Sequence, residues 1–206
     1  MSTHAFTVKE ALSFGWNTFK NNWQFLVIVF AIVYATGLVP AWIVKLSNGS
    51  FPAITSLASL CVIVLQMIIA IGVIVISLKI VDRKKPEITD LFTNFPLLLN
   101  YFLGALLYAG VIIVGIILLI IPGIIWGIKY QYTMYLIIDK KMGPFEAFKK
   151  SGKITQGNKM RLFWLGLSFG VLYMAGELLL HIGLILVYPI IYLSGAYVYR
   201  KLSPKQ

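Results

Sequence analysis

The sequence predicts an all-α membrane protein: a polytopic helical bundle of six transmembrane helices in three hairpins, each hairpin preceded by a short interfacial amphipathic helix. The stretch from Phe102 to Ile128 contains no charged residue and no histidine. Hydrophobic residues make up 59% of the chain and charged residues 12%, which is more apolar surface than a soluble domain can bury. The apolar segments are too long for membrane strands and lack alternating polarity, which favours helices over a barrel.

The first unit is an interfacial helix over residues 7–21 and two spans over about 23–44 and 52–80. Thr7 and Glu10 have the spacing of a capping box, which starts a helix. One face of that helix is apolar, with residues at helical spacing: Val8, Leu12, Trp16, Phe19 and Trp23. Each following run reaches the roughly 20 residues that cross a bilayer core.

The second unit is an amphipathic segment over 86–94, opened by Pro86, and two spans over about 95–121 and 122–138. Pro122 and Gly123 interrupt the apolar run without a polar spacer, which favours a tight hairpin on the non-cytoplasmic side. The alternative is a flexible half-helix break of the kind that lines transporter sites.

The third unit is an amphipathic segment over 144–158 and two spans over about 162–180 and 183–199. Pro144 suits the first position of a helix. Each unit carries an acidic–apolar–apolar triplet before its first span: Glu10-Ala11-Leu12, Asp90-Leu91-Phe92 and Glu146-Ala147-Phe148. The triplets indicate a degenerate threefold repeat within a single integral membrane domain, residues 1–206.

The basic residues predict the orientation. Of the 18 Lys and Arg residues, 16 fall on one side of the predicted spans; Lys45 falls on the other side and Lys129 within a span. By the positive-inside rule both termini and the two long loops are cytoplasmic, in a multi-pass protein of the bacterial inner membrane. The same asymmetry accounts for the net charge of +11, so we expect no nucleic-acid partner.

A set of motifs between Gly115 and Leu165 carries a family resemblance. They are the run Gly-Ile-Ile-Leu-Leu-Ile-Ile-Pro-Gly-Ile-Ile, then Lys129-Tyr130, Glu146-Ala147-Phe148, Ser151, Gly157-Asn158-Lys159 and Leu162-Phe163-Trp164-Leu165. The chain resembles the small bacterial membrane proteins related to the glycerophosphoryl diester phosphodiesterase membrane domain, including YciC-like proteins. The resemblance implies six helices and no hydrolase domain, because that activity belongs to a separate domain that this sequence lacks.

Four polar side chains inside or at the ends of spans are candidates for an intramembrane site: Lys129, Gln131, Glu177 and His181. An ionisable residue at depth is a functional hypothesis by default, although such groups also serve only to fix helix packing. Lys129 and Glu177 fall at similar predicted depths, which predicts an ion pair between them.

Basic residues in and after the amphipathic segment 144–158 are the candidates for contacts with anionic lipid headgroups: Lys149, Lys150, Lys153, Lys159 and Arg161. Helices of this type lie in the interface plane and attract anionic lipid. The alternative is that these charges only determine the topology.

The composition contains no catalytic or metal-ligating constellation, so we expect no enzyme activity, no metal and no cofactor. The expected function is that of a scaffold or accessory protein for membrane or envelope processes, which contacts anionic phospholipid and other membrane proteins. The alternative is a small transporter or lipid-handling protein with a polar site around Lys129 and Glu177.

Overall fold

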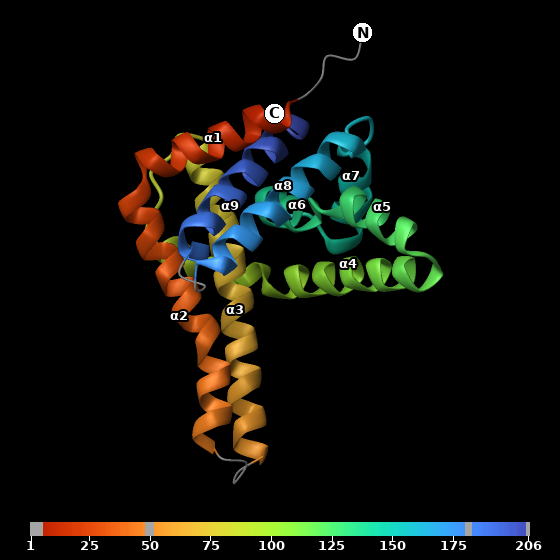
Figure 1. Cartoon of the computed structure of the whole chain (residues 1–206). Coiled ribbons are helices and arrows are strands. Elements are labelled where there is room, and N and C mark those ends of the chain that lie inside the picture. Colours follow the sequence, from red (N-terminus) through yellow and green to blue (C-terminus); the bar gives the residue numbers. More distant parts are fainter. Residues whose placement is uncertain (1–5, 48–51, 180–182, 205–206) are drawn as a thin grey trace.

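The computed structural model describes residues 6–47, 52–179 and 183–204. Every regular element in these ranges is helical, which confirms the all-α class (Figure 1). The elements are α1 (Val8–Asn21), α2 (Trp23–Ser47), α3 (Pro52–Val81), η1 (Ile88–Leu91), η2 (Phe95–Leu97), α4 (Leu98–Leu118), α5 (Ile120–Tyr130), α6 (Thr133–Lys140), α7 (Pro144–Ile154), α8 (Lys159–Leu178) and α9 (Gly183–Leu202).

Within the described residues, four helical stretches are long and apolar enough to cross a membrane: Trp23–Pro40, Thr55–Val81, Ile88–Leu118 and Gly183–Leu202. The expected single span over 122–138 is wrong, because the chain forms α5 and α6 there, with a break at Gln131 and Tyr132. The 11 residues of α5 cover only about 16 Å of a roughly 30 Å core. The expected span over 162–180 corresponds to α8, which carries charged residues near both of its ends.

The turn between α4 and α5 lies at Leu119, whose backbone is extended with φ −170° and ψ 146°. Pro122 therefore falls in the first turn of α5, where the missing N–H would have no helical partner in any case. A Cβ on Gly115 would lie 2.7 Å from Cα of Gly123, so α4 and α5 approach closely where both residues lack side chains. The helix break thus precedes the predicted Pro122-Gly123 position by three residues.

The first predicted helix, α1, forms with the expected capping box. Thr7 Oγ1 accepts the Glu10 N–H at 3.1 Å, and Glu10 Oε2 accepts the Thr7 N–H at 3.3 Å. Pro144 opens α7, also as predicted. The expected short helix over 86–94 is wrong, because the chain forms only the 3₁₀ turn η1 within that range, and η2 follows it from Phe95. A segment bounded by Pro86 and Pro96 is too short to nucleate an α-helix without help.

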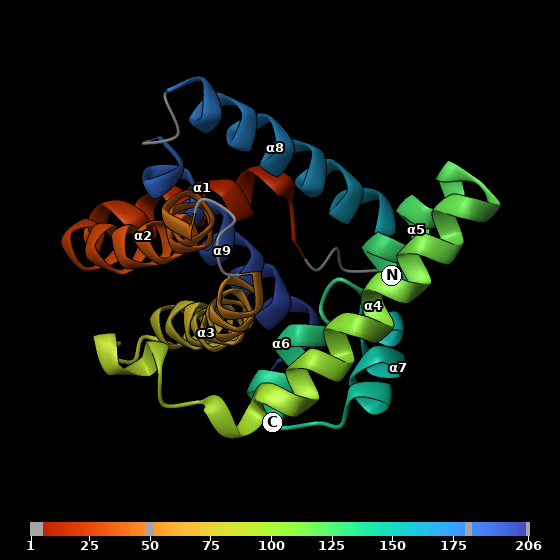
Figure 2. The ribbon, with the colours of Figure 1, turned by 90° about the horizontal axis from the view of Figure 1, so that it is seen from below.

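The short elements that precede the hairpins, α1, η1 and α7, follow one packing rule. Each lies against the last helix of the preceding unit: η1 against α3, α7 against α6 and, closing the ring, α1 against α9 (Figures 1 and 2). The middle residue of each triplet is the anchor, since Ala11, Leu91 and Ala147 are all fully buried. The repeat in the sequence therefore corresponds to a repeated contact in the structure.

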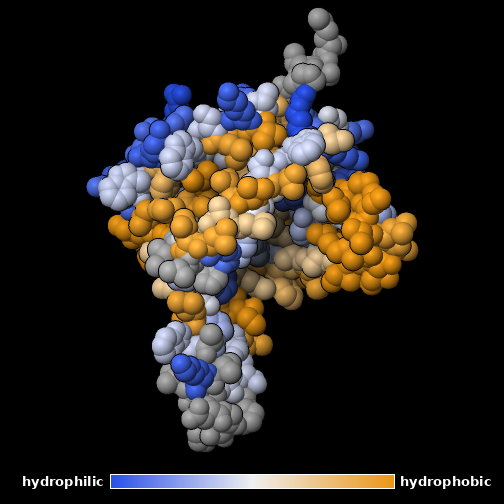
Figure 3. Space-filling view, viewed as in Figure 1, coloured by the Kyte–Doolittle hydropathy of each residue, from blue (hydrophilic) through white to orange (hydrophobic). Residues whose placement is uncertain are grey.

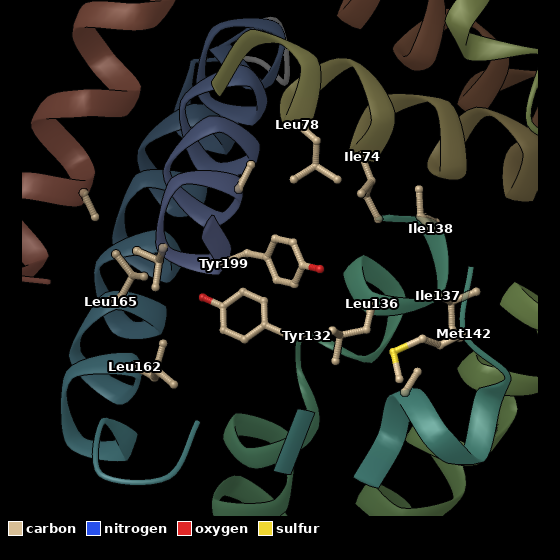
Figure 4. Packing of buried hydrophobic residues seen from close by; sticks show 14 of the residues in the cluster. Ile74, Leu78, Tyr132, Leu136, Ile137, Ile138, Met142, Leu162, Leu165 and Tyr199 are labelled. Atoms are coloured by element: carbon tan, nitrogen blue, oxygen red, sulfur yellow. The ribbon is translucent and has the colours of Figure 1, made fainter. Parts of the chain in front are cut away.

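The main core lies where α3, α6, α8 and α9 meet, around Tyr132, Leu136 and Tyr199 (Figure 4). Away from it, the α2–α3 hairpin projects from the body and α4 runs across its axis (Figure 1). The tip of the α4–α5 hairpin leaves Ile117 78% and Ile121 70% exposed. Polar residues gather over α1 and the C-terminal end of α9, above an apolar surface (Figure 3). This distribution fits a membrane protein with one polar cap.

Candidate functional site

The polar cap is organised around Arg200, which lies near the end of α9. Its Nε and Nη2 donate to the two carboxylate oxygens of Asp82 at 2.9 Å each. Its Nη1 and Nη2 donate to the two oxygens of Asp139 at 2.6 Å each. The three side chains are only 11–15% exposed. Two bidentate pairs on one guanidinium use the fixed fork of donors that only arginine offers.

The sequence brings these groups together through its repeat. Asp82 follows the last residue of α3, Asp139 is in the last turn of α6, and Arg200 is in the last turn of α9. The three units thus end at one point, where the Tyr199 hydroxyl also donates to Asp139 Oδ2 at 2.8 Å. The sequence interpretation missed this cluster, although an Asp-basic pair directly after an apolar run is visible in two of the three units.

An ion pair connects η1 to α3, and a hydrogen bond to a carboxylate connects α1 to α9. Lys79 Nζ of α3 donates to Asp90 Oδ1 of η1 at 2.6 Å, and Asp90 Oδ2 accepts the Glu87 N–H at 2.9 Å. The Tyr197 hydroxyl donates to Glu10 Oε1 and lowers the pKa of that carboxyl below its usual value. Acidic triplet residues therefore hold η1 on α3 and α1 on α9.

The break between α5 and α6 is held by α7. The carbonyl of Lys129 accepts hydrogen bonds from Ser151 Oγ at 3.2 Å and Thr155 Oγ1 at 3.0 Å. The Tyr132 N–H donates to Ser151 Oγ at 3.2 Å. The carbonyl and amide of the break are thus satisfied by hydroxyl groups 19 to 26 residues away in sequence.

Replacing Ser151 by alanine should destabilise the protein by about 1–3 kcal/mol, because a buried backbone amide loses its partner. Unfolding in detergent, followed by tryptophan fluorescence, measures this loss. Ser168→Ala is the matched control, since within the described residues that hydroxyl bonds to the Trp164 carbonyl of its own helix. Equal stability of the two variants would contradict this role of Ser151.

One face of α7 carries an exposed stripe at i, i+4 and i+8: Phe145, Lys149 and Lys153. The opposite positions Ala147 and Ser151 are buried. Phe145 also lines an apolar groove of about 460 Å³ between α4, α5 and α7. Lys150 is half-buried, and Phe148 stacks on Tyr130 with ring centroids 3.7 Å apart.

Residues 104–206, half of the chain, match the family described as protein of unknown function (DUF975). The chain belongs to this family. It is 28% identical over 235 aligned residues to "Uncharacterized protein Rv2560" of Mycobacterium tuberculosis, an alignment that covers all of this chain and 71% of that protein. The same figures hold for "Uncharacterized protein Mb2590" of Mycobacterium bovis. No solved structure matches this DUF975 chain.

The structure of this DUF975 member separates the four intramembrane candidates. Lys129 Nζ lies 4.9 Å from the ring centroid of Tyr130, and Gln131 Nε2 donates to the Ile128 carbonyl at 3.0 Å. Glu177 Oε1 accepts the Tyr173 hydroxyl at 2.6 Å. His181 lies outside the described residues.

The predicted ion pair between Lys129 and Glu177 is wrong. Lys129 packs against Gly152 of α7, while Glu177 lies at the far end of α8, next to Gly176, which contacts Leu184 of α9. Figure 2 shows α8 running from α5 towards the start of α9. The prediction compared depths along parallel helices, and α8 does not run alongside α5.

Lys159 and Arg161, the last two headgroup candidates, lie in the first turn of α8. Arg161 Nη1 donates to Asn158 Oδ1 at 3.3 Å. Lys159 borders an apolar recess of about 340 Å³ between α5 and α8. Lys159 is thus placed at the edge of an apolar surface, and both residues lie in α8, apart from the α7 stripe.

Proposed function

We propose that this DUF975 protein is a non-enzymatic scaffold or accessory protein of the bacterial cytoplasmic membrane, which binds anionic phospholipid through α7. The observation that carries the proposal is the α7 stripe. It places two exposed lysines in line with Phe145 and the apolar groove between α4 and α5.

A phospholipid matches this arrangement, because its anionic phosphate suits the two lysines and its acyl chains suit the apolar groove. Each basic residue near an anionic surface contributes about 1 kcal/mol, and each buried methylene contributes about 0.8 kcal/mol. The groove can therefore contribute more binding free energy than the two lysines. Lys149 and Lys153 provide the preference for an anionic headgroup.

Orientation and partners belong to the same proposal. The basic cap faces the cytoplasm with both chain termini, and the α2–α3, α4–α5 and α8–α9 pairs insert into the membrane as three hairpins. The exposed apolar hairpins provide contacts for other membrane proteins. The relation to the glycerophosphoryl diester phosphodiesterase membrane domain stays a prediction.

One observation favours the alternative, a transporter or lipid-handling protein. A cavity of about 390 Å³ lies between α2, α3 and α9, with Tyr34, Gln66 and Tyr188 in its wall. The Gln66 Nε2 atom is buried and has no hydrogen-bond partner in the described part of the chain. An unsatisfied amide is costly within a bilayer, so a ligand with an oxygen acceptor would suit this place. The candidate cavity thus lies away from Lys129.

The test is lipid binding by the full-length protein in neutral detergent, measured by native mass spectrometry with phosphatidylglycerol and phosphatidylcholine. Phosphatidylglycerol should bind more tightly, and replacing both Lys149 and Lys153 by glutamine should weaken its binding about tenfold or more. Lys140→Gln with Lys141→Gln removes the same charge outside the stripe and should have a smaller effect. Equal binding of the two lipids by the unmodified protein would overturn the proposal.

A further inference from the structure

A second cavity, of about 540 Å³, lies in the polar cap between the end of α1 and the end of α3. It is distant in sequence from α7 and was not among the predicted sites. Three consecutive cations contribute to its wall from the α3 side, Arg83, Lys84 and Lys85. Polar side chains face them from α1: Thr18, Asn21 and Asn22. No Asp or Glu belongs to the described wall.

The backbone at Arg83 is unusual for an arginine. The helix α3 ends in a Schellman motif, in which the Arg83 N–H donates to the Ile80 carbonyl at 3.0 Å and the Lys84 N–H to the Lys79 carbonyl at 2.8 Å. The motif requires a left-handed residue, which is usually glycine. Here it is Arg83, with φ 57°. The fold alone favours glycine at this position, so the side chain indicates a use other than folding.

The charges of this cavity are not neutralised by the protein. Among the described residues, none of its three cations forms an ion pair, and all three are exposed. The neighbouring carboxylates have other partners: Asp82 is bound by Arg200, and Glu87 accepts the Thr89 hydroxyl at 3.2 Å. Three adjacent positive charges repel one another, and a bound anion relieves that repulsion.

The cavity lies at the level where a membrane surface is expected. Trp16 and Trp23 on the adjoining helices are 49% and 54% exposed, and exposed tryptophans are typical of the membrane–water interface. At Asn22 the chain passes from the amphipathic α1 to the apolar α2. Phe14 and Val81 give the same cavity an apolar side.

We infer that this cavity binds the phosphate of an anionic phospholipid headgroup, with Arg83, Lys84 and Lys85 as the cationic ligands. Thr18, Asn21 and Asn22 provide polar contacts to the oxygens around the phosphate, and Phe14 and Val81 contact the start of the acyl chains. The inference deepens the proposed function and rests on it, since it assigns the same lipid class a second, separate site.

The decisive variant is Arg83→Gly, tested in the full-length protein in neutral detergent. Glycine is the residue that the Schellman motif prefers, so the midpoint of thermal unfolding should stay the same or rise. Binding of dioctanoyl phosphatidylglycerol should nevertheless weaken about fivefold. Replacing Arg83, Lys84 and Lys85 together by glutamine should remove one bound lipid from the saturated complex counted by native mass spectrometry.

The α7 variant with Lys149, Lys150 and Lys153 replaced by glutamine is the matched control, because it removes three charges elsewhere on the same face. Each triple variant should remove one phosphatidylglycerol, and a variant that combines all six substitutions should remove two; if the combined variant loses no more lipid than either triple variant alone, the cavity is not a separate site and the inference fails. If inorganic phosphate displaces the lipid at equal concentration, the ligand is a soluble phosphate and the lipid assignment fails. Equal binding of phosphatidylcholine and phosphatidylglycerol by the unmodified protein would contradict the proposed function as well. This outcome distinguishes failure of the proposed function from failure of the cavity inference alone.

Discussion

Replacing Arg200 by methionine is expected to destabilise the folded protein by about 3–5 kcal/mol, the range found when one partner of a buried ion pair is removed. The substitution leaves Asp82 and Asp139 facing each other without the guanidinium that lies between them. Both carboxylates are at most 15% exposed, so water cannot replace the lost donors. Unfolding in detergent, followed by loss of far-UV circular dichroism, measures the effect.

Two further variants separate the charge from the geometry. Arg200→Lys keeps the charge but cannot form two bidentate pairs, so it should recover only part of the stability. Combining Arg200→Met with Asp82→Asn and Asp139→Asn removes the two carboxylate charges that the guanidinium had balanced and should recover much of the stability. Lys9→Met, at an exposed position of α1, is the control and should change stability by less than about 0.5 kcal/mol. Losses that simply add across the three positions would contradict a shared cluster.

Local signals in the sequence were sufficient for several elements. The capping box of Thr7 and Glu10 starts α1, Pro144 starts α7, and the charge-free run after Phe102 forms α4 and α5. Each of these signals acts over a few residues, through backbone geometry or the length of an apolar run. The triplets also marked real contacts, since the central residue of each is buried.

The break between α5 and α6 could not be read locally. No glycine or proline lies between Tyr130 and Thr133, and the group that stabilises the break is Ser151, which is 19 residues from Tyr132. The Arg200 cluster was missed for a related reason. Its members come from three units, and only their convergence at one point makes the arginine the shared partner of two aspartates.

The contact between α3 and η1 depends on Gly72, which has no side chain, so a substitution there should have a large effect on stability. A Cβ added to Gly72 would lie 2.3 Å from the Cα and 2.5 Å from the carbonyl oxygen of Leu91. Both are backbone atoms, which cannot move aside as a flexible side chain can. Leu91 is itself fully buried and belongs to the second triplet.

Gly72→Ala is therefore expected to destabilise the protein by about 3 kcal/mol, the upper part of the usual range for overpacking. Gly110→Ala is the control, since no atom of the described residues lies within 4 Å of a Cβ at that position in α4. Alanine there should stabilise the helix by about 0.5–1 kcal/mol. Stability changes of opposite sign for the same Gly→Ala substitution would separate the effect of the contact from that of helix propensity. Hydrogen exchange should localise the loss of protection in Gly72→Ala to η1 and the end of α3. If both variants gain stability, η1 does not pack on α3 as described.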